Sequence, residues 1–335
     1  MDFDLSADQL ALRDAARDLL DARASTDHVR KVLDAEEGYD PELWREMAAQ
    51  GWLAIEVPED VGGLGLGFVE VAVLAEEVGR HVAPAPYIST VLARRALATT
   101  DWAERLTEGT AVGAVAWGAS PVIDAPIADV LVVVRDSDVT AYDISATKPT
   151  RVEAMDQTRR MARIDPTELD GGVEVGGDDL VTSMLDAGAT AYAAELLGAA
   201  QRMLEASVDY AKVREQFGRP IGSFQAVKHR CADMLVDVEG MRSAVWYAAW
   251  AVETNAADRS LAASTAKAWA SDAGMRVMNS ALQVHGGIGF TWEHDLHLYL
   301  KRAQLDSVVF GDATYHRERI ARLLKTRLDS GAGVF

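Results

Sequence analysis

The residues from Val213 to His229, VREQFGRPIGSFQAVKH, concentrate positive charge in a turn between two long helical patterns. The basic residues of this stretch and its border are Arg214, Arg219, Lys228, His229 and Arg230. Gly218, Pro220 and Gly222 favour a bend, and Ser223 is available to cap the helix that follows. A guanidinium group beside a helix N-terminus suits a diphosphate, because its N–H groups point outward and lack partners. The segment therefore predicts a diphosphate site, with a solvated helix–helix turn as the alternative.

A second stretch, Gln283 to Phe290 with the sequence QVHGGIGF, ends another helical pattern with three glycines. Glycine at 286, 287 and 289 frees the backbone from steric limits and lets it approach a flat or charged group. Many helices end in glycine, so this run has little weight by itself. In this order and spacing, however, REQFG, FQ and QVHGGIGF followed by YLKRAQ form a specific combination.

This combination resembles the acyl-CoA dehydrogenase family, and the resemblance covers the whole chain. It implies an α+β, mainly α fold with an N-terminal helical domain over 1–109, a shortened middle β-domain over 110–177 and a C-terminal four-helix bundle over 178–335. It also implies an acyl-CoA substrate and FAD as the cofactor, usually in a tetramer. In the family, the Arg of RxxFG and the Gln and glycines of QxxGGxG hold the ADP half of an FAD whose flavin lies mainly on the neighbouring subunit.

The positions that match this FAD-binding pattern lie in the two stretches described above. They are Arg214, Gln216, Phe217 and Gln225 around the basic turn, and Gln283, Gly286 and Gly287 in the glycine run. By this resemblance, the basic turn holds the pyrophosphate and adenosine of FAD.

The catalytic base of the family has no clear counterpart in this chain. Family members remove the α-proton of the thioester with a carboxylate while the β-hydride goes to the flavin. Most of them carry this base in a Tyr-Glu-Gly-Thr stretch near the C-terminus, and here SVVFGDATYHRERIAR has Phe310 at the Glu position. A shift of two residues would align Asp312 instead, but Asp is one methylene shorter than Glu, which matters at a reacting distance of roughly 3 Å.

A minority of the family carries the base on the first bundle helix, 26 residues before the Arg of RxxFG, and that position is Gly188 here. Asp186 and Glu195 belong to the same helix. At 3.6 residues per turn they are rotated from position 188 by about 160° and about 20°. Glu195 therefore points the right way but lies nearly two turns further along.

The middle segment departs from the family as well. The usual Thr-Glu-Pro-x-x-Gly-Ser-Asp loop, which contacts flavin and substrate, is replaced by WGASPVIDAPIADV at 117–130. The chain therefore keeps the residues for the ADP half of FAD and lacks those for catalysis on a flavin of its own.

A division of labour between two chains explains this pattern best. In some bacterial relatives that act on steroid CoA esters, two homologous chains form an α2β2 tetramer. One brings the catalytic Glu and its partner brings the ADP-binding residues, and an electron-acceptor flavoprotein reoxidises the flavin. We expect this chain to be the base-lacking subunit. The alternatives are a self-sufficient homo-oligomeric enzyme that uses Asp312, and a catalytically silent binding or scaffold protein that keeps only the fold.

Other candidate residues are better explained structurally. His294 and His297 have no carboxylate or cysteine at metal-ligand spacing, so we expect surface polar residues on a helix and no metal site. His285 is expected to line the cofactor site or to pack. The loop VGGLGLG at 61–67 lacks the GK[ST] of a phosphate-binding loop, so we do not assign a nucleotide site there.

The elements that must position these residues can be read from the apolar repeats. Ser6 and Gln9 form a capping box before a helix over 10–23, and further helices begin at Pro41 and over 68–81. Short β-branched runs at 111–117, 129–134, 139–144 and 152–156 predict strands. A helix of more than 30 residues from Asp178, and helices over 224–253, 258–284 and 293–324, predict the bundle.

Composition limits the classes of partner. The chain has 335 residues and a formal net charge of -19, which disfavours nucleic acid and anionic membranes. Its one cysteine, Cys231, excludes an internal disulfide framework and favours a reducing compartment. No apolar run reaches the roughly 18 residues of a membrane span. The acidic start MDFDLSADQLALRD does not resemble a signal peptide, so we expect a cytoplasmic protein.

Overall fold

The N-terminal part of the chain is helical, as its 3.6-residue repeat predicts. The computed structural model describes residues 4–118 and 121–331. The elements here are α1 (Ala7–Arg23), α2 (Thr26–Leu33), α3 (Pro41–Ala49), α4 (Phe68–Arg80), α5 (Tyr87–Ala96) and α6 (Trp102–Thr107), with 3₁₀ turns η1 (Trp52–Ala54) and η2 (Glu59–Val61). The capping box at α1 is confirmed, because the Ser6 hydroxyl accepts from the Gln9 N–H at 3.2 Å and the Gln9 side chain accepts from the Ser6 N–H at 2.9 Å.

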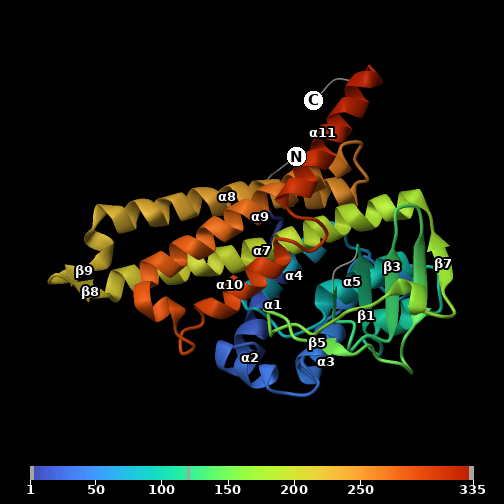
Figure 1. Ribbon diagram of the computed structural model, residues 1–335, viewed down its shortest axis with the longest axis horizontal. Coiled ribbons are helices and arrows are strands. Elements are labelled where there is room, and N and C mark those ends of the chain that lie inside the picture. The colour runs from blue at the N-terminus through green and yellow to red at the C-terminus, as the bar shows by residue number, and fades with distance from the viewer. Residues whose placement is uncertain (1–3, 119–120, 332–335) are drawn as a thin grey trace.

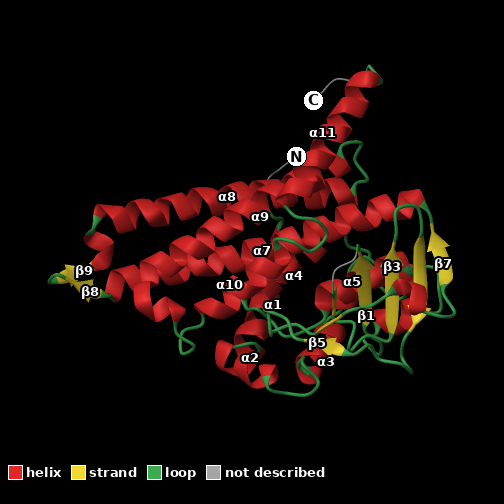
Figure 2. Cartoon of the chain, viewed as in Figure 1, coloured by secondary structure: helices red, strands yellow, loops and turns green. Residues whose placement is uncertain are grey.

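The β-part lies against one end of the long helices, as Figure 2 shows. One sheet has the order β1 (Gly113–Trp117), β3 (Val130–Val134), β4 (Val139–Asp143), β7 (Val173–Gly176), and a second has β2 (Val122–Ile123), β6 (Met161–Ala162), β5 (Arg151–Val152). β1 and β3 are parallel with Val115 opposite Val132, and the other pairs are antiparallel. The 3₁₀ turn η3 (Pro166–Glu168) precedes β7.

The strand predicted over 152–156 is wrong beyond its first residue. β5 ends at Val152, and Asp156 instead turns inward, where its carboxylate accepts from the Thr158 N–H at 2.9 Å and from Arg302 Nε at 2.9 Å. The chain leaves the strand conformation here, and the Asp156 carboxylate pairs with the buried Arg302.

The C-terminal part consists of helices, of which the longest lie side by side while α11 projects from them at one end (Figure 1). They are α7 (Asp178–Val213), α8 (Gln225–Glu253), α9 (Arg259–His285), α10 (Leu296–Asp306) and α11 (Ala313–Asp329), with the hairpin β8 (Glu215–Gln216) and β9 (Arg219–Pro220) and the 3₁₀ turns η4 (Ile221–Ser223) and η5 (Gly286–Phe290). No helix within 4–118 or 121–331 combines the length and the apolar character needed to cross a bilayer.

Three sequence predictions about the bundle are wrong. The single helix expected over 293–324 is two helices, because Phe310 and Gly311 adopt positive φ angles of 56° and 95° and end the helical path. The second error concerns Ser223, which lies in η4, while the N-cap of α8 is Phe224 without a side-chain cap. His294 also precedes α10 rather than lying on it.

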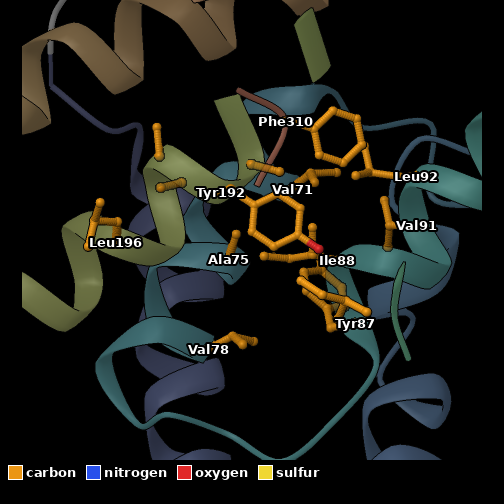
Figure 3. Packing of buried hydrophobic residues seen from close by; sticks show 14 of the residues in the cluster. Val71, Ala75, Val78, Tyr87, Ile88, Val91, Leu92, Tyr192, Leu196 and Phe310 are labelled. Atoms are coloured by element: carbon orange, nitrogen blue, oxygen red, sulfur yellow. The ribbon is translucent and has the colours of Figure 1, made fainter. Parts of the chain in front are cut away.

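The core joins the N-terminal helices to the bundle. Figure 3 shows Val71, Ala75 and Val78 of α4 near Tyr192 and Leu196 of α7, with side chains of α5 on the right. At the crossing of α4 and α7, a Cβ on Gly79 would lie 1.8 Å from the Glu195 carbonyl oxygen, and a Cβ on Gly198 would lie 1.8 Å from that of Glu76. Only glycine allows the two backbones to come this close.

Candidate functional site

The basic turn forms a short hairpin at one end of the bundle (Figure 1). β8 and β9 pair antiparallel, with Gln216 opposite Arg219. Phe217 and Gly218 make the turn at positive φ angles of 56° and 75°. A positive φ strains a bulky residue such as Phe, and the Phe217 side chain is also 91% exposed. The hairpin thus presents an apolar ring to solvent in a strained conformation, as is typical of a contact with another molecule.

The cations of this hairpin are available for an anion. Arg214 follows α7 and is exposed, and Arg219 stacks over the Phe224 ring at 4.3 Å. Neither guanidinium forms an ion pair with any residue that the structure describes. α8 begins at Gln225 without a side-chain cap, so its first N–H groups are open. Free guanidinium groups beside an open helix N-terminus are suited to bind a pyrophosphate.

The glycine run offers a surface that a ligand can approach closely. α9 ends at His285, and Gly286 takes a φ of 63°. A Cβ on Gly286 or Gly287 would have no atom of this chain within 4 Å. Gln283 is exposed one turn before them. These glycines are therefore not required by packing within the chain, and their open face allows a ligand to approach the backbone closely.

The hairpin β8–β9 and the end of α9, which carry the seven predicted cofactor residues or adjoin them, lie at the same end of the bundle (Figure 1). Two contacts between helices connect the basic turn with the glycine run. Tyr210 near the end of α7 stacks on His285 at a centroid distance of 4.7 Å, and Arg230 Nη1 donates to Ser280 Oγ at 3.4 Å. Within the described chain, no hydrogen bond joins the hairpin directly to η5.

The two positions at which the sequence analysis expected a catalytic base, 188 and 310, contact each other in this fold. A Cβ on Gly188 of α7 would lie 2.3 Å from Cε1 of Phe310, which follows α10. Neither residue can accept a proton, and Phe310 is 4% exposed. The ring therefore occupies the space into which either carboxylate would project.

Aromatic stacking fixes Phe310 in this place. Its ring stacks on Trp117 at 6.0 Å with an interplanar angle of 11°, and on Tyr192 at 5.7 Å with 27° (Figure 3 labels Phe310 and Tyr192). Burial raises the pKa of the Tyr192 phenol, which therefore stays neutral. An apolar cavity of about 310 Å³ borders this stack.

The other carboxylates that the sequence offers near the base position form hydrogen bonds or ion pairs within the chain. Asp312 is the N-cap of α11, where its side chain accepts from the Tyr315 N–H at 2.8 Å. Glu195 is fully buried and accepts from Arg302 Nη1 at 2.6 Å and from Arg159. Asp186 is buried beside Arg319 at 2.7 Å. Each carboxylate therefore has a structural partner in this chain.

Sequence reasoning missed the buried charge network around Arg302. This arginine joins Asp156 of the β-part, at 2.9 Å, to Glu195 of α7, at 2.6 Å, and it also donates to Thr158. Asp306 lies nearby with both carboxylate oxygens buried and without a hydrogen-bond partner among the described atoms. Burial, followed by the proximity of Glu195, raises the pKa of Asp306 well above its usual range. The available signal was Glu195 within the apolar run AYAAELLGAA, since an isolated charge in such a run requires a buried partner.

Two further buried groups hold the turn that carries Phe310. Lys267 of α9 donates to the Asp306 carbonyl at 2.6 Å, and burial lowers its pKa to about 7. His316 of α11 lies with Nε2 2.8 Å from the Phe310 carbonyl, so this nitrogen carries the proton. Burial lowers the pKa of His316 to about 3. These contacts satisfy the carbonyl groups exposed by the break between α10 and α11.

The remaining candidates have local roles. His285 is buried, its Nδ1 lies 2.8 Å from the Ala281 carbonyl, and burial lowers its pKa. His294 Nδ1 accepts from the Leu296 N–H at 3.1 Å, and His297 Nε2 lies 3.2 Å from Arg30 Nη1. In the described part of the chain, no group of side chains is arranged to hold a metal ion. The free thiol of Cys231 is partly buried, which raises its pKa.

Comparisons with known families match both helical parts of the chain. Residues 6–101 match the model of the acyl-CoA dehydrogenase N-terminal domain, and residues 176–325 match that of the acyl-CoA dehydrogenase C-terminal domain. Together these two matches cover more than half of the 335 residues.

Similar proteins match over nearly the whole length. The chain is 39% identical to acyl-CoA dehydrogenase IpdE2 of Mycolicibacterium smegmatis, over 95% of this chain and 98% of that protein. It is 32% identical to acyl-CoA dehydrogenase FadE27 of Mycobacterium tuberculosis, over 97% and 99%. Among solved structures, a steroid ACAD variant, Tcur3481-Tcur3483, matches with a TM-score of 0.86 at 30% identity, over 96% of this chain and 99% of that chain. The ChsE4-ChsE5 complex from Mycobacterium tuberculosis matches with a TM-score of 0.84 at 28% identity, over 97% and 99%.

Proposed function

The chain belongs to the acyl-CoA dehydrogenase family, FAD-dependent oxidoreductases of the CH–CH bond of acyl-CoA thioesters, and on this premise we propose that it is the base-lacking subunit of a heteromeric enzyme. The contact between Phe310 and Gly188 carries this proposal. Both positions that could bear the base lack an acid, and the ring seals the space between them. This chain therefore binds and positions, while the partner subunit supplies the carboxylate.

The residues that hold FAD in this proposal are those at the end of the bundle. Arg214, with Gln216, Phe217 and Gln225, faces the pyrophosphate and adenosine, and Gln283, Gly286 and Gly287 form the open glycine surface beside them. When bound, FAD accepts the hydride that leaves the β-carbon of the acyl group. The free guanidinium of Arg214 neutralises the diphosphate, and the absence of side chains at 286 and 287 allows close backbone approach.

The proposed partner is a homologous acyl-CoA dehydrogenase subunit that carries the catalytic Glu, in an α2β2 assembly. The structural match to the ChsE4-ChsE5 complex supports a heteromeric arrangement, and the match to a steroid ACAD supports a steroid side-chain CoA ester as substrate. An electron-acceptor flavoprotein and a cytoplasmic location complete the proposal, together with the division into domains at 1–109, 110–177 and 178–335. The position of all seven strands β1 to β7 between Gly113 and Gly176 supports that division.

The self-sufficient alternative depends on Asp312 as the base. Its carboxylate is exposed and already accepts a hydrogen bond as the cap of α11, which makes it a weak candidate for proton abstraction. The scaffold alternative requires that the chain bind no FAD in any assembly. The open glycine surface and the unpaired Arg214 argue for a cofactor instead.

Coexpression tests the proposal directly. The chain would be purified alone and together with a Glu-bearing relative encoded beside it, and flavin absorbance per chain and native mass would be measured. We expect flavin only in the complex, at one FAD for two chains. FAD bound to a homo-oligomer of this chain would favour the enzyme that uses Asp312, and a colourless protein in both preparations would favour the scaffold.

A further inference from the structure

A cavity of about 650 Å³ lies where the C-terminal ends of α7 and α9 meet the N-terminal helices. Its border includes Asp21 and Thr26 from the N-terminal part, Arg202 and Tyr210 of α7, and His285 at the end of α9. The volume falls within the roughly 300–1,000 Å³ of small-molecule sites. Of the described residues that border it, none is among the seven predicted to hold FAD, so this cavity is distinct from that half-site.

His285 presents a hydrogen-bond acceptor to this cavity. Its Nδ1 lies 2.8 Å from the Ala281 carbonyl, which can only accept, so Nδ1 carries the proton and Nε2 keeps a lone pair. The side chain is 5% exposed, and Nε2 has no hydrogen-bond partner in the described part of the chain. Burial lowers the pKa of His285, which keeps the ring neutral at pH 7. A ligand that donates a hydrogen bond would satisfy this nitrogen.

His294 presents the complementary donor. Its Nδ1 accepts from the Leu296 N–H at 3.1 Å, so the neutral ring carries its proton on Nε2. His294 borders the same cavity, and its ring lies beside that of His285 with a centroid distance of 4.7 Å and an interplanar angle of 61°. The cavity therefore offers an acceptor and a donor side by side.

An aromatic face accompanies this pair and favours a flat heterocycle. Tyr210 stacks on His285 with a centroid distance of 4.7 Å and an interplanar angle of 23°. Proteins bind unpaired bases by stacking on such rings while the polar edge of the base forms hydrogen bonds. A 6-aminopurine has an amino donor beside the acceptor N7, whereas a 6-oxopurine has two acceptors, O6 and N7. An amino donor facing His285 and a ring acceptor facing His294 therefore select the 6-aminopurine.

The charges around the cavity favour a phosphate on this ligand. Of the two arginines, Arg80 pairs with Glu205 at 2.6 Å, whereas Arg202 is exposed and forms no ion pair with any residue that the structure describes. α2 begins at Thr26 on the same border, and the first N–H groups of a helix are open to an anion. A free guanidinium and a helix N-terminus on one cavity suit a phosphate.

The carboxylates on the border do not oppose this phosphate strongly, because each already has a partner. These pairs are Asp21 with His81 at 3.0 Å, Asp209 with Lys212 at 3.2 Å, and Asp295 with Arg30 at 2.9 Å. The unpaired charge at the cavity is therefore the positive charge of Arg202.

We propose that this cavity binds a phosphorylated nucleoside of a 6-aminopurine, such as AMP. The purine stacks on Tyr210 and His285, and the phosphate lies toward Arg202. The site is directly behind the glycine run, because His285 precedes Gly286. It lies wholly on this chain and goes beyond the proposed FAD half-site, since it needs neither FAD nor a partner subunit.

Isothermal titration calorimetry with AMP on the full chain, purified alone, tests the proposal. We expect one saturable site per chain and at least about tenfold weaker binding of IMP, whose 6-oxo group faces the lone pair of His285. His285→Phe keeps a stacking ring and removes the acceptor, and it should weaken AMP binding by a similar factor. Arg202→Gln, at an exposed position, should also weaken binding about tenfold, whereas Arg163→Gln, at an exposed arginine outside the cavity, should not.

The ligand comparison and Arg202→Gln keep the test decisive even where His285→Phe does not fold. Saturable AMP binding that exceeds IMP binding and that Arg202→Gln weakens supports the proposal. Tighter binding of adenosine 3′,5′-bisphosphate than of AMP also supports it, and identifies the nucleotide end of coenzyme A as the source of the same chemistry.

Three results would overturn the proposal: no saturable AMP binding, equal affinity for IMP, or equal loss of binding in Arg163→Gln and Arg202→Gln. Loss of AMP binding in Arg214→Ala would assign AMP to the FAD half-site and would overturn it as well. Because the chain is tested without a partner, failure of the coexpression experiment would leave this result unaffected.

Discussion

Phe310 stands where a side chain on residue 188 would have to be, since a Cβ on Gly188 would lie 2.3 Å from Cε1 of the Phe310 ring. One residue follows α10 and the other lies in the first third of α7, yet they form one contact. Because this contact replaces both possible carboxylates, the missing base is a property of the packed core and not of a mobile loop.

This contact predicts a strong coupling between the two positions. Gly188→Ala should destabilise the chain by about 1–3 kcal/mol, because the added methyl overpacks the ring. Phe310→Ala should cost about 3–5 kcal/mol through the cavity it leaves. In the double variant the methyl occupies that cavity, so the cost of Gly188→Ala should vanish. Urea unfolding of the four proteins measures this, and additive costs would show that the two residues do not touch.

The glycine surface predicts a variant that separates folding from cofactor binding. A side chain at 287 meets no atom of this chain, and the φ of Gly287 is not in the left-handed region. Gly287→Val should therefore leave the melting temperature unchanged and reduce FAD in the coexpressed complex, which flavin absorbance reports. Arg214→Ala should also reduce FAD, whereas Arg45→Ala, at an exposed arginine on α3, should not. Full flavin content in Gly287→Val would contradict the assignment of this surface.

The lowered pKa of His316 predicts that acid reduces the stability of the folded chain. Its folded pKa is about 3 against an ordinary value of 6.5, so the unfolded chain takes up a proton that the folded chain refuses. The free energy of unfolding therefore falls as the pH drops from about 6.5 towards 3. His316→Gln keeps an N–H for the Phe310 carbonyl and cannot titrate. Between pH 6.5 and 5 the unsubstituted chain should lose about 2 kcal/mol more than this variant in urea unfolding, and parallel pH profiles would refute the prediction.

The buried ion pairs of Arg302 predict that removal of this arginine destabilises the folded chain. Arg302→Met would leave Asp156 and Glu195 with less compensation in the core, at a cost of about 3–5 kcal/mol. Arg276→Met is the matched control, since Arg276 pairs with Asp237 at 2.6 Å on the surface and is 50% exposed, and it should cost no more than about 1 kcal/mol. Thermal unfolding monitored by circular dichroism compares the two, and equal costs would contradict the buried network.

Local signals in the sequence were sufficient for much of the fold. The Ser6 capping box, three of the predicted strands and the first three bundle helices depend on neighbours in the chain, and the structure agrees with them apart from the ends. The break between α10 and α11 was missed because the 3.6-residue repeat continues across it and outweighed the single Gly311.

The candidate site also has one part that local sequence signals predicted and another part that they did not. The two stretches with glycine and basic motifs carry their own pattern, and their location at one end of the bundle follows from antiparallel helices of similar length. The stack of Trp117 on Phe310 joins residues almost 200 positions apart, and the partners of Glu195 come from two other elements. Such contacts are set by tertiary packing, which no local repeat encodes.

The glycine crossing of α4 and α7 has a mechanical consequence. Because the two backbones touch at Gly79 and Gly198, neither helix can slide or rotate past the other without forcing a carbonyl into its neighbour. The N-terminal helices and the bundle must therefore move as one rigid block. Any hinge in this molecule must lie elsewhere, at the connections of the β-part or at the exposed hairpin that follows α7.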